Sequence, residues 1–124
     1  MLVATDAAGH SFVLDAKSDT GGSDAGFRPI DLVMVALAGC AAMDIVSILK
    51  KKRADLRSFR AEMEGERATE HPMRLTRIRV RFIANKEVRI ADLQRAMELS
   101  RDKYCSVAGT LKTAPEIDYD VRVE

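Results

Sequence analysis

Two cysteines are the residues of this 124-residue chain best suited to carry chemistry. Cys40 lies within the apolar run from Leu32 to Met43, and Cys105 lies between Tyr104 and Ser106, where a second helix is expected to start or bend. If the fold brings the two thiols together, they form a dithiol that can reduce a peroxide and close into a disulfide. Free cysteine is more commonly a small buried side chain, so this chemistry depends on the elements that position both residues.

Two charged residues could tune these thiols. Arg28 directly precedes the helix expected to carry Cys40, and a cation lowers the pKa of a nearby thiol, although arginines in loops are commonly solvated. Asp44 lies one turn after Cys40 on the same helix face. A carboxylate there would raise the thiol pKa, and on an apolar helix it needs a partner. We therefore expect Asp44 to line the site or an interface. Cys105 could gain from the start of the following helix and from Lys103.

Composition indicates one globular domain spanning residues 1–124. Apolar residues make up 47% of the chain and charged residues 31%, and the net charge of +1 gives no reason to expect a nucleic-acid or membrane partner. Two cysteines are too few for a disulfide-stapled secreted domain, and no secretory signal is visible. We expect a cytoplasmic protein with transient disulfides at most. His10 and His71 are not spaced with the cysteines as metal ligands would be, so no metal or other cofactor is expected.

A long apolar helix is the main element expected to position Cys40. It begins at Pro29, which favours the first helical turn, and ends near Lys52 among the cations 50–53. Between Leu32 and Leu49 it is apolar nearly all round, which is typical of a buried helix. A membrane span is a weaker alternative, because the run is shorter than the roughly 20 apolar residues required. A chain of this size cannot easily bury such a helix alone, which favours a homodimer.

Strands are expected on both sides of this helix. Residues 2–5 and 11–15 suggest a hairpin, and residues 18–28 a glycine- and serine-rich loop. Residues 58–67 and 75–84 alternate, with glutamates at 62, 64 and 66 facing arginines at 77, 79 and 81. A helix follows from Ile90, a further helical piece spans 106–112, and alternation over 117–123 predicts a final strand. The class is α+β, with a curved antiparallel sheet wrapped around the central helix.

These motifs resemble the OsmC/Ohr family of thiol-dependent hydroperoxide reductases. The resemblance rests on Pro29-x-Asp-Leu-x(4)-Leu-Ala-Gly-Cys40 together with Tyr104-Cys-Ser-Val107, and the pattern Gly39-Cys-x-x-x-Asp44 is similar to the YhfA-type subgroup. It implies an OsmC-like fold in an intertwined homodimer, with the active site at the interface. It also implies that Cys40 attacks the peroxide, that Cys105 resolves the product, and that a dithiol donor, often a lipoylated protein, reduces the disulfide.

The chain departs from this family pattern at two places. Ile30 occupies the position where family peroxidases place a glutamate, and the stretch 7–11 lacks the arginine that usually holds the thiolate. Two functional classes therefore stay open. One is a two-cysteine reductase of organic hydroperoxides that protects against peroxide stress. The alternative is a ligand-binding or thiol-sensing member of the fold with little peroxidase activity.

Overall fold

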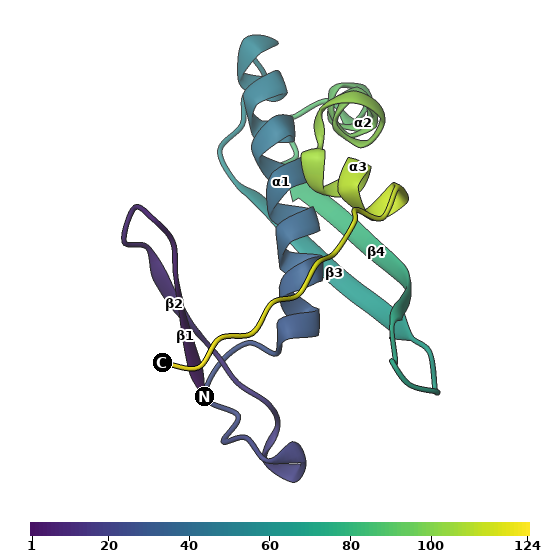
Figure 1. Cartoon of the computed structure of the whole chain (residues 1–124). Coiled ribbons are helices and arrows are strands. Elements are labelled where there is room, and N and C mark those ends of the chain that lie inside the picture. The colour runs from purple at the N-terminus through teal and green to yellow at the C-terminus, as the bar shows by residue number, and fades with distance from the viewer.

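The computed structural model describes all 124 residues and arranges them around one long helix (Figure 1). The elements are β1 Leu2–Thr5, β2 Ser11–Leu14, α1 Pro29–Lys51, β3 Phe59–Arg67, β4 Leu75–Ala84, α2 Ile90–Leu99 and α3 Ser106–Lys112. A 3-10 turn, Ser18–Thr20, precedes α1, and a π-helical turn, Ser100–Tyr104, joins α2 to α3. The α+β class is confirmed, and the predicted elements are found with nearly the same bounds, except for the last strand.

The hydrophobic core lies at the C-terminal end of α1. Ile45 and Leu49 of α1 are fully buried against Ala96 of α2 and Val88 of the loop before it. The rings of Phe59 and Phe82 stack beside them, with centroids 6.1 Å apart. Both helix ends follow the sequence rules, because Pro29 occupies the first turn and Lys50 and Lys51 the last. The core therefore fixes the half of α1 that follows Cys40.

Strands β3 and β4 form an antiparallel pair that packs against α1. The register places Glu62 opposite Arg81 and Glu64 opposite Arg79, as the charge pattern predicts, and Arg79 Nη1 lies 2.7 Å from Glu64 Oε1. Gly65 of β3 lies close to the side chain of Met34 in α1. A Cβ atom there would lie 2.7 Å from both the Met34 sulfur and a Leu75 methyl carbon, so these side chains would have to move to admit a larger residue.

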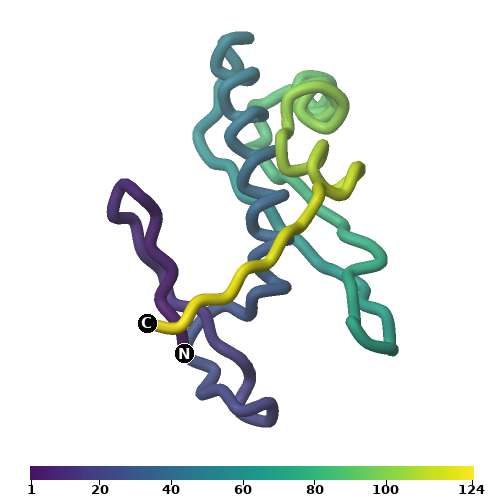
Figure 2. Tube along the Cα trace, in the orientation of Figure 1, coloured from purple at the N-terminus to yellow at the C-terminus, as the bar shows by residue number.

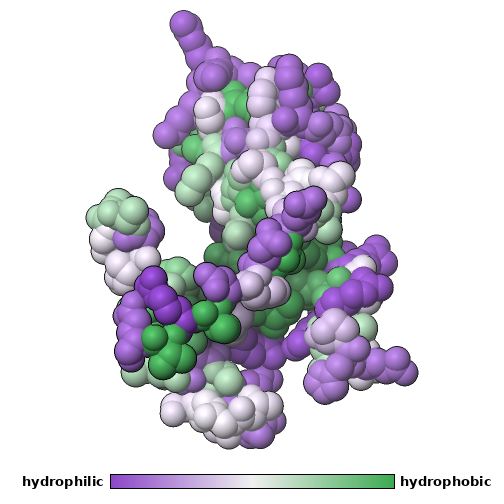
Figure 3. All heavy atoms as spheres, viewed as in Figure 1, coloured by the Kyte–Doolittle hydropathy of each residue, from purple (hydrophilic) through white to green (hydrophobic).

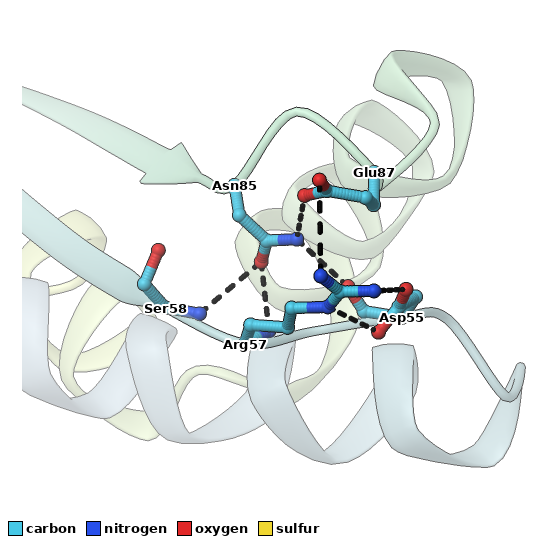
Figure 4. A network of polar contacts seen from close by, with 5 residues as sticks. All are labelled: Asp55, Arg57, Ser58, Asn85 and Glu87. Carbon is cyan, nitrogen blue, oxygen red and sulfur yellow. Dashed lines mark hydrogen bonds and ion pairs between the residues drawn. The ribbon is translucent and has the colours of Figure 1, made fainter.

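A polar network ties the start of β3 to the loop that enters α2 (Figure 4). The Asn85 side-chain oxygen accepts hydrogen bonds from the backbone N–H groups of Arg57, at 2.7 Å, and Ser58, at 3.1 Å. Its amide nitrogen donates to the Asp55 carbonyl and to Glu87. Arg57 in turn pairs with the Asp55 carboxylate. The network holds β3, β4 and the entry to α2 in one arrangement, which positions α2 beside α1.

One side of α1 is open in this chain, so the prediction of a helix buried on most sides does not hold within one chain. Only Ala38, Ile45 and Leu49 of the helix are buried, whereas Val35 is 39% and Met43 77% exposed. Two strands and two short helices cover the other side. By length and composition α1 could cross a membrane, but it packs against β3, β4 and α2, as a core helix does.

The final predicted strand, residues 117–123, is a correction, because residues 113–124 form no strand. The strands form two separate pairs, β1 with β2 and β3 with β4, and the tail joins neither of them. In Figures 1 and 2 the tail leaves α3, passes in front of α1 and ends near the N-terminus, close to the β1–β2 hairpin. The apolar residues of the predicted strand are 65 to 97% exposed: Ile117, Tyr119, Val121 and Val123. Figure 3 shows apolar surface in the middle and lower parts of the molecule, while the end near α2 is mostly hydrophilic.

Candidate active site

The fold brings the two cysteines together from positions far apart in the sequence. Cys40 lies midway along α1, and Cys105 is the extended residue that caps the N-terminus of α3. The Cys40 sulfur lies 3.7 Å from the hydroxyl oxygen of Ser106, the residue after Cys105. Each thiol also shifts the pKa of the other through a hydrogen bond. Both cysteines are free thiols in this structure.

Cys40 has a lowered pKa because it faces the first backbone N–H groups of α3. The N–H of Val107 is the largest cause, and the Cys105 thiol, the Ser106 hydroxyl and the Ser106 N–H act in the same direction against desolvation. The first N–H groups of a helix have no partner within the helix, and they carry partial positive charge. They therefore favour the thiolate of Cys40, which is the nucleophilic form.

Cys105 has a raised pKa, chiefly because burial disfavours its charged form. Its sulfur accepts a hydrogen bond from the Ala108 N–H at 3.4 Å, but neighbouring Cys40 opposes ionisation. The expectation that the start of α3 would benefit Cys105 is thus met only in part. The Ser106 N–H acts on Cys40, and the Val107 N–H acts on both thiols but is the largest cause of the shift at Cys40. Lys103 lies over the ring of Tyr104, 5.3 Å from its centroid.

The two charged candidates lie in different places. Asp44 lies beside the π-helical turn, where its Oδ2 accepts a hydrogen bond from the Ser100 hydroxyl at 2.8 Å. Arg28 instead forms two hydrogen bonds with Asp31, at 2.7 and 2.9 Å. Twelve residues of helix correspond to about 18 Å, so the structure does not bring Arg28 to Cys40 of the same chain. No three histidine, cysteine or carboxylate side chains gather in a way that could hold a metal ion.

An apolar pocket of about 380 Å³ opens beside the thiols. Ten of its twelve lining residues are hydrophobic, and they come from α1, β4, α2 and the segment around α3. Cys105 forms part of its wall, and so does Ala41, the residue after Cys40. Gln94 and Arg101 are the polar lining residues, and the Arg101 guanidinium is paired with Asp102 at 2.7 and 3.0 Å. The pocket therefore offers mainly apolar contact to a bound molecule.

Sequence reasoning missed Ser100 at this site, and it assigned the helix start at Ser106 and Val107 to Cys105 and not to Cys40. Ser100 is completely buried, and its carbonyl accepts the Cys105 N–H at 2.8 Å across the π-helical turn. Ser106 and Val107 act through backbone N–H groups, which every residue except proline carries.

Known proteins match the chain over most of its length. A family model described as OsmC-like protein matches residues 21–120. Protein YhfA of Escherichia coli strain K12 is 36% identical over 123 residues, which cover 98% of this chain and 89% of that protein.

Solved structures share the fold. The crystal structure of a hypothetical protein from Aquifex aeolicus has a TM-score of 0.70 at 26% identity, covering 91% of this chain and 86% of the other. An organic hydroperoxide resistance protein OsmC from Legionella pneumophila has a TM-score of 0.63 at 10% identity, covering 84% of this chain and 75% of the other. From the match of the family model and the shared identity with YhfA, the chain belongs to the OsmC-like family.

Proposed function

We propose that this protein is a thiol-dependent reductase of organic hydroperoxides, with Cys40 as the attacking and Cys105 as the resolving cysteine. The opposite surroundings of the two neighbouring thiols carry this proposal. The helix start at α3 favours the thiolate of Cys40, while burial keeps Cys105 protonated. A peroxide-reducing cycle needs one thiolate nucleophile and a second thiol within reach of it. The OsmC structure named for organic hydroperoxide resistance supports the same reading at the level of the fold.

The proposed cycle has three balanced steps. The Cys40 thiolate attacks the terminal oxygen of the hydroperoxide, so that an S–O bond forms, the O–O bond breaks and the alkoxide leaves as an alcohol after taking a proton. Cys105 then attacks the sulfenic sulfur of Cys40, the S–O bond breaks and water leaves. The resulting disulfide is reduced by thiol–disulfide exchange with an external dithiol, which is itself oxidised. A lipoylated protein in the cytoplasm is the reductant that we propose.

The apolar pocket supports an organic substrate. Its volume of about 380 Å³ lies in the range of small-molecule sites, which are mostly apolar with a few polar groups. Hydrogen peroxide would gain nothing from such walls, whereas the hydrocarbon part of an alkyl or aryl hydroperoxide would be desolvated there. The preference for organic over hydrogen peroxide follows from this difference in burial.

We also propose that the active unit is a homodimer. Much apolar surface is exposed to water in one chain. It lies on the open side of α1, on the hairpin residues Leu2, Val3 and Phe12, and on the tail residues 117–123. A second copy would cover these surfaces, and we expect an interface above about 2,000 Å², as in obligate dimers. Arg28 could then support a thiolate across the interface. Sedimentation velocity at micromolar concentration should show a dimer, and a stable monomer would contradict this part of the proposal.

A ligand-binding or thiol-sensing role is the second candidate. It is favoured by the pocket itself, whose wall contains the protonated thiol of Cys105, and by Ile30 in place of the family glutamate. In that case a bound apolar molecule would be the natural occupant, and the thiols would respond to oxidants without rapid turnover.

Single-turnover oxidation distinguishes these two candidates. The reduced protein is mixed with one equivalent of cumene hydroperoxide or hydrogen peroxide, and the products are identified by mass spectrometry. We expect faster reaction with cumene hydroperoxide and one intrachain Cys40–Cys105 disulfide. Cys105→Ala should stop at a Cys40 sulfenic acid that dimedone traps, and Cys40→Ala should consume no peroxide. If both thiols stay titratable, or if Cys105 is oxidised first, the reductase proposal fails and the second candidate stands.

A further inference from the structure

Asp44 and Ser100 form a polar contact inside an otherwise apolar region. Asp44 lies one turn after Cys40 on α1, and its Oδ2 accepts a hydrogen bond of 2.8 Å from the Ser100 hydroxyl. This is the only hydrogen bond of the Asp44 side chain, and Ser100 is completely buried. Because a buried hydroxyl costs stability unless it is hydrogen-bonded, the half-buried Asp44 carboxylate satisfies Ser100 and ties it to α1.

Ser100 connects this contact to the second thiol. Its own N–H caps α2 by donating to the carbonyls of Ala96 and Met97, and its carbonyl accepts the Cys105 N–H at 2.8 Å. The residues between form the π-helical turn Ser100–Tyr104. A π-helical turn carries an extra residue and occurs frequently at functional sites. It shifts Cys105 out of the line of α2.

We propose that Asp44 is a positioning residue for Cys105 and acts through Ser100. Helix α1 thus carries the first thiol and, one turn later, the carboxylate that anchors the segment holding the second thiol. The Asp44–Ser100 bond fixes the π-helical turn, and the Ser100 carbonyl fixes the backbone of Cys105. The Asp44–Ser100 bond thus holds the Cys105 segment beside the part of α1 that carries Cys40. The consequence for disulfide closure rests on the proposed function, but the anchoring itself does not.

The anchoring predicts how readily the two thiols close into a disulfide. The test equilibrates the full chain with mixtures of reduced and oxidised glutathione, where each closure converts one oxidised to two reduced glutathione molecules. The ratio gives the effective concentration of one thiol for the other. Ser100→Ala and Asp44→Ala remove the bond from its two sides. Each should lower this effective concentration about tenfold, on the scale of one hydrogen bond to a charged group.

Two further variants separate positioning from a general loss of stability. Asp44→Asn keeps an oxygen acceptor for Ser100 and should restore closure to near the wild-type value. Ser47→Ala, at an exposed serine of the same helix, should change nothing. If Ser100→Ala does not fold, the pair Asp44→Ala and Asp44→Asn gives the same comparison, with melting temperature recorded for each.

Two outcomes would overturn the inference alone, and a third would overturn it together with the reductase proposal. If wild type closes its disulfide and Ser100→Ala and Asp44→Ala close it equally well, Asp44 does not position Cys105. If Asp44→Asn is as impaired as Asp44→Ala, the hydrogen bond is not the cause. The glutathione equilibrium uses no peroxide, so a protein that ignores hydroperoxides can still confirm the anchoring. A wild type that never closes the disulfide would remove both proposals.

Discussion

The surroundings of Cys40 and Cys105 differ although the two thiols are neighbours. Cys40 faces unpaired backbone N–H groups at the start of α3, which stabilise a negative charge. Cys105 is 7% exposed and lines an apolar pocket, which disfavours a charge. The difference shows that the start of α3 acts on both thiols, but that at Cys105, the thiol that caps the helix, burial outweighs it. The two roles in the proposed cycle follow from this asymmetry.

The largest expected effect is the difference in reactivity between the two thiols. Because only the thiolate reacts, and because each pKa unit changes its fraction about tenfold, we expect iodoacetamide to alkylate Cys40 at least about tenfold faster than Cys105 at pH 7. Single-cysteine variants, Cys105→Ala and Cys40→Ala, give each profile separately. The rate midpoint of Cys40 should lie below the ordinary thiol value and that of Cys105 above it. Coinciding midpoints would break the comparison.

A smaller effect is expected when the helix start is altered at Ser106. Ser106→Pro removes an N–H and a hydroxyl that both lower the Cys40 pKa. Proline is tolerated at the first position of a helix, and the extended backbone of Cys105, at φ −72° and ψ 104°, suits a residue before proline. The alkylation midpoint of Cys40 should rise, but only in part, because the Val107 N–H remains.

Ser106→Ala is the matched control for this change. It removes the hydroxyl and keeps the N–H, so its midpoint should lie between those of wild type and Ser106→Pro. The reactivity of Cys105 should change little in either variant, because the Ala108 N–H that its sulfur accepts is retained. A Cys40 midpoint that does not move in Ser106→Pro would show that the start of α3 does not tune this thiol.

The smallest effect is expected at Arg28. Its guanidinium pairs with Asp31, and Cys40 of the same chain is not among the groups that shift the pKa of Arg28. In a monomeric preparation, Arg28→Ala should leave the alkylation profile of Cys40 unchanged. A rise of about one unit, the scale of a lost neighbouring charge, would support the sequence-based role of Arg28. Repeating the measurement in a dimeric preparation would then show whether the partner chain supplies it.

Local patterns in the sequence predicted most of the elements. The bounds of α1 follow from Pro29 and the closing lysines, and the alternation over 75–84 gives β4 with its charged face. The failure at residues 117–123 has a physical reason, since alternation reports a tendency to pair and not the presence of a partner edge. The same limit applies to α1, whose apolar character indicates burial without saying which chain provides it.

The site was only partly predictable for a similar reason. The motifs of the family resemblance pointed to Cys40 and Cys105, and a carboxylate on an apolar helix pointed to Asp44. Ser100 carries no such signal, as its role depends on a π-helical turn that brings it beside residue 44. Backbone donors such as the Val107 N–H leave no trace in the side-chain sequence. Their contribution becomes visible only when α3 is placed against α1.

The exposed tail has a consequence for the behaviour of newly made chains. Its backbone donors and acceptors along 117–123 are free, and a free strand edge is a template for aggregation. Asp118 and Asp120 act against the simplest form of this, since identical tails stacked in register would bring like charges together. Pairing with a strand of different sequence avoids that repulsion. The two aspartates thus disfavour self-association of identical tails, while the tail can still pair with a strand of different sequence.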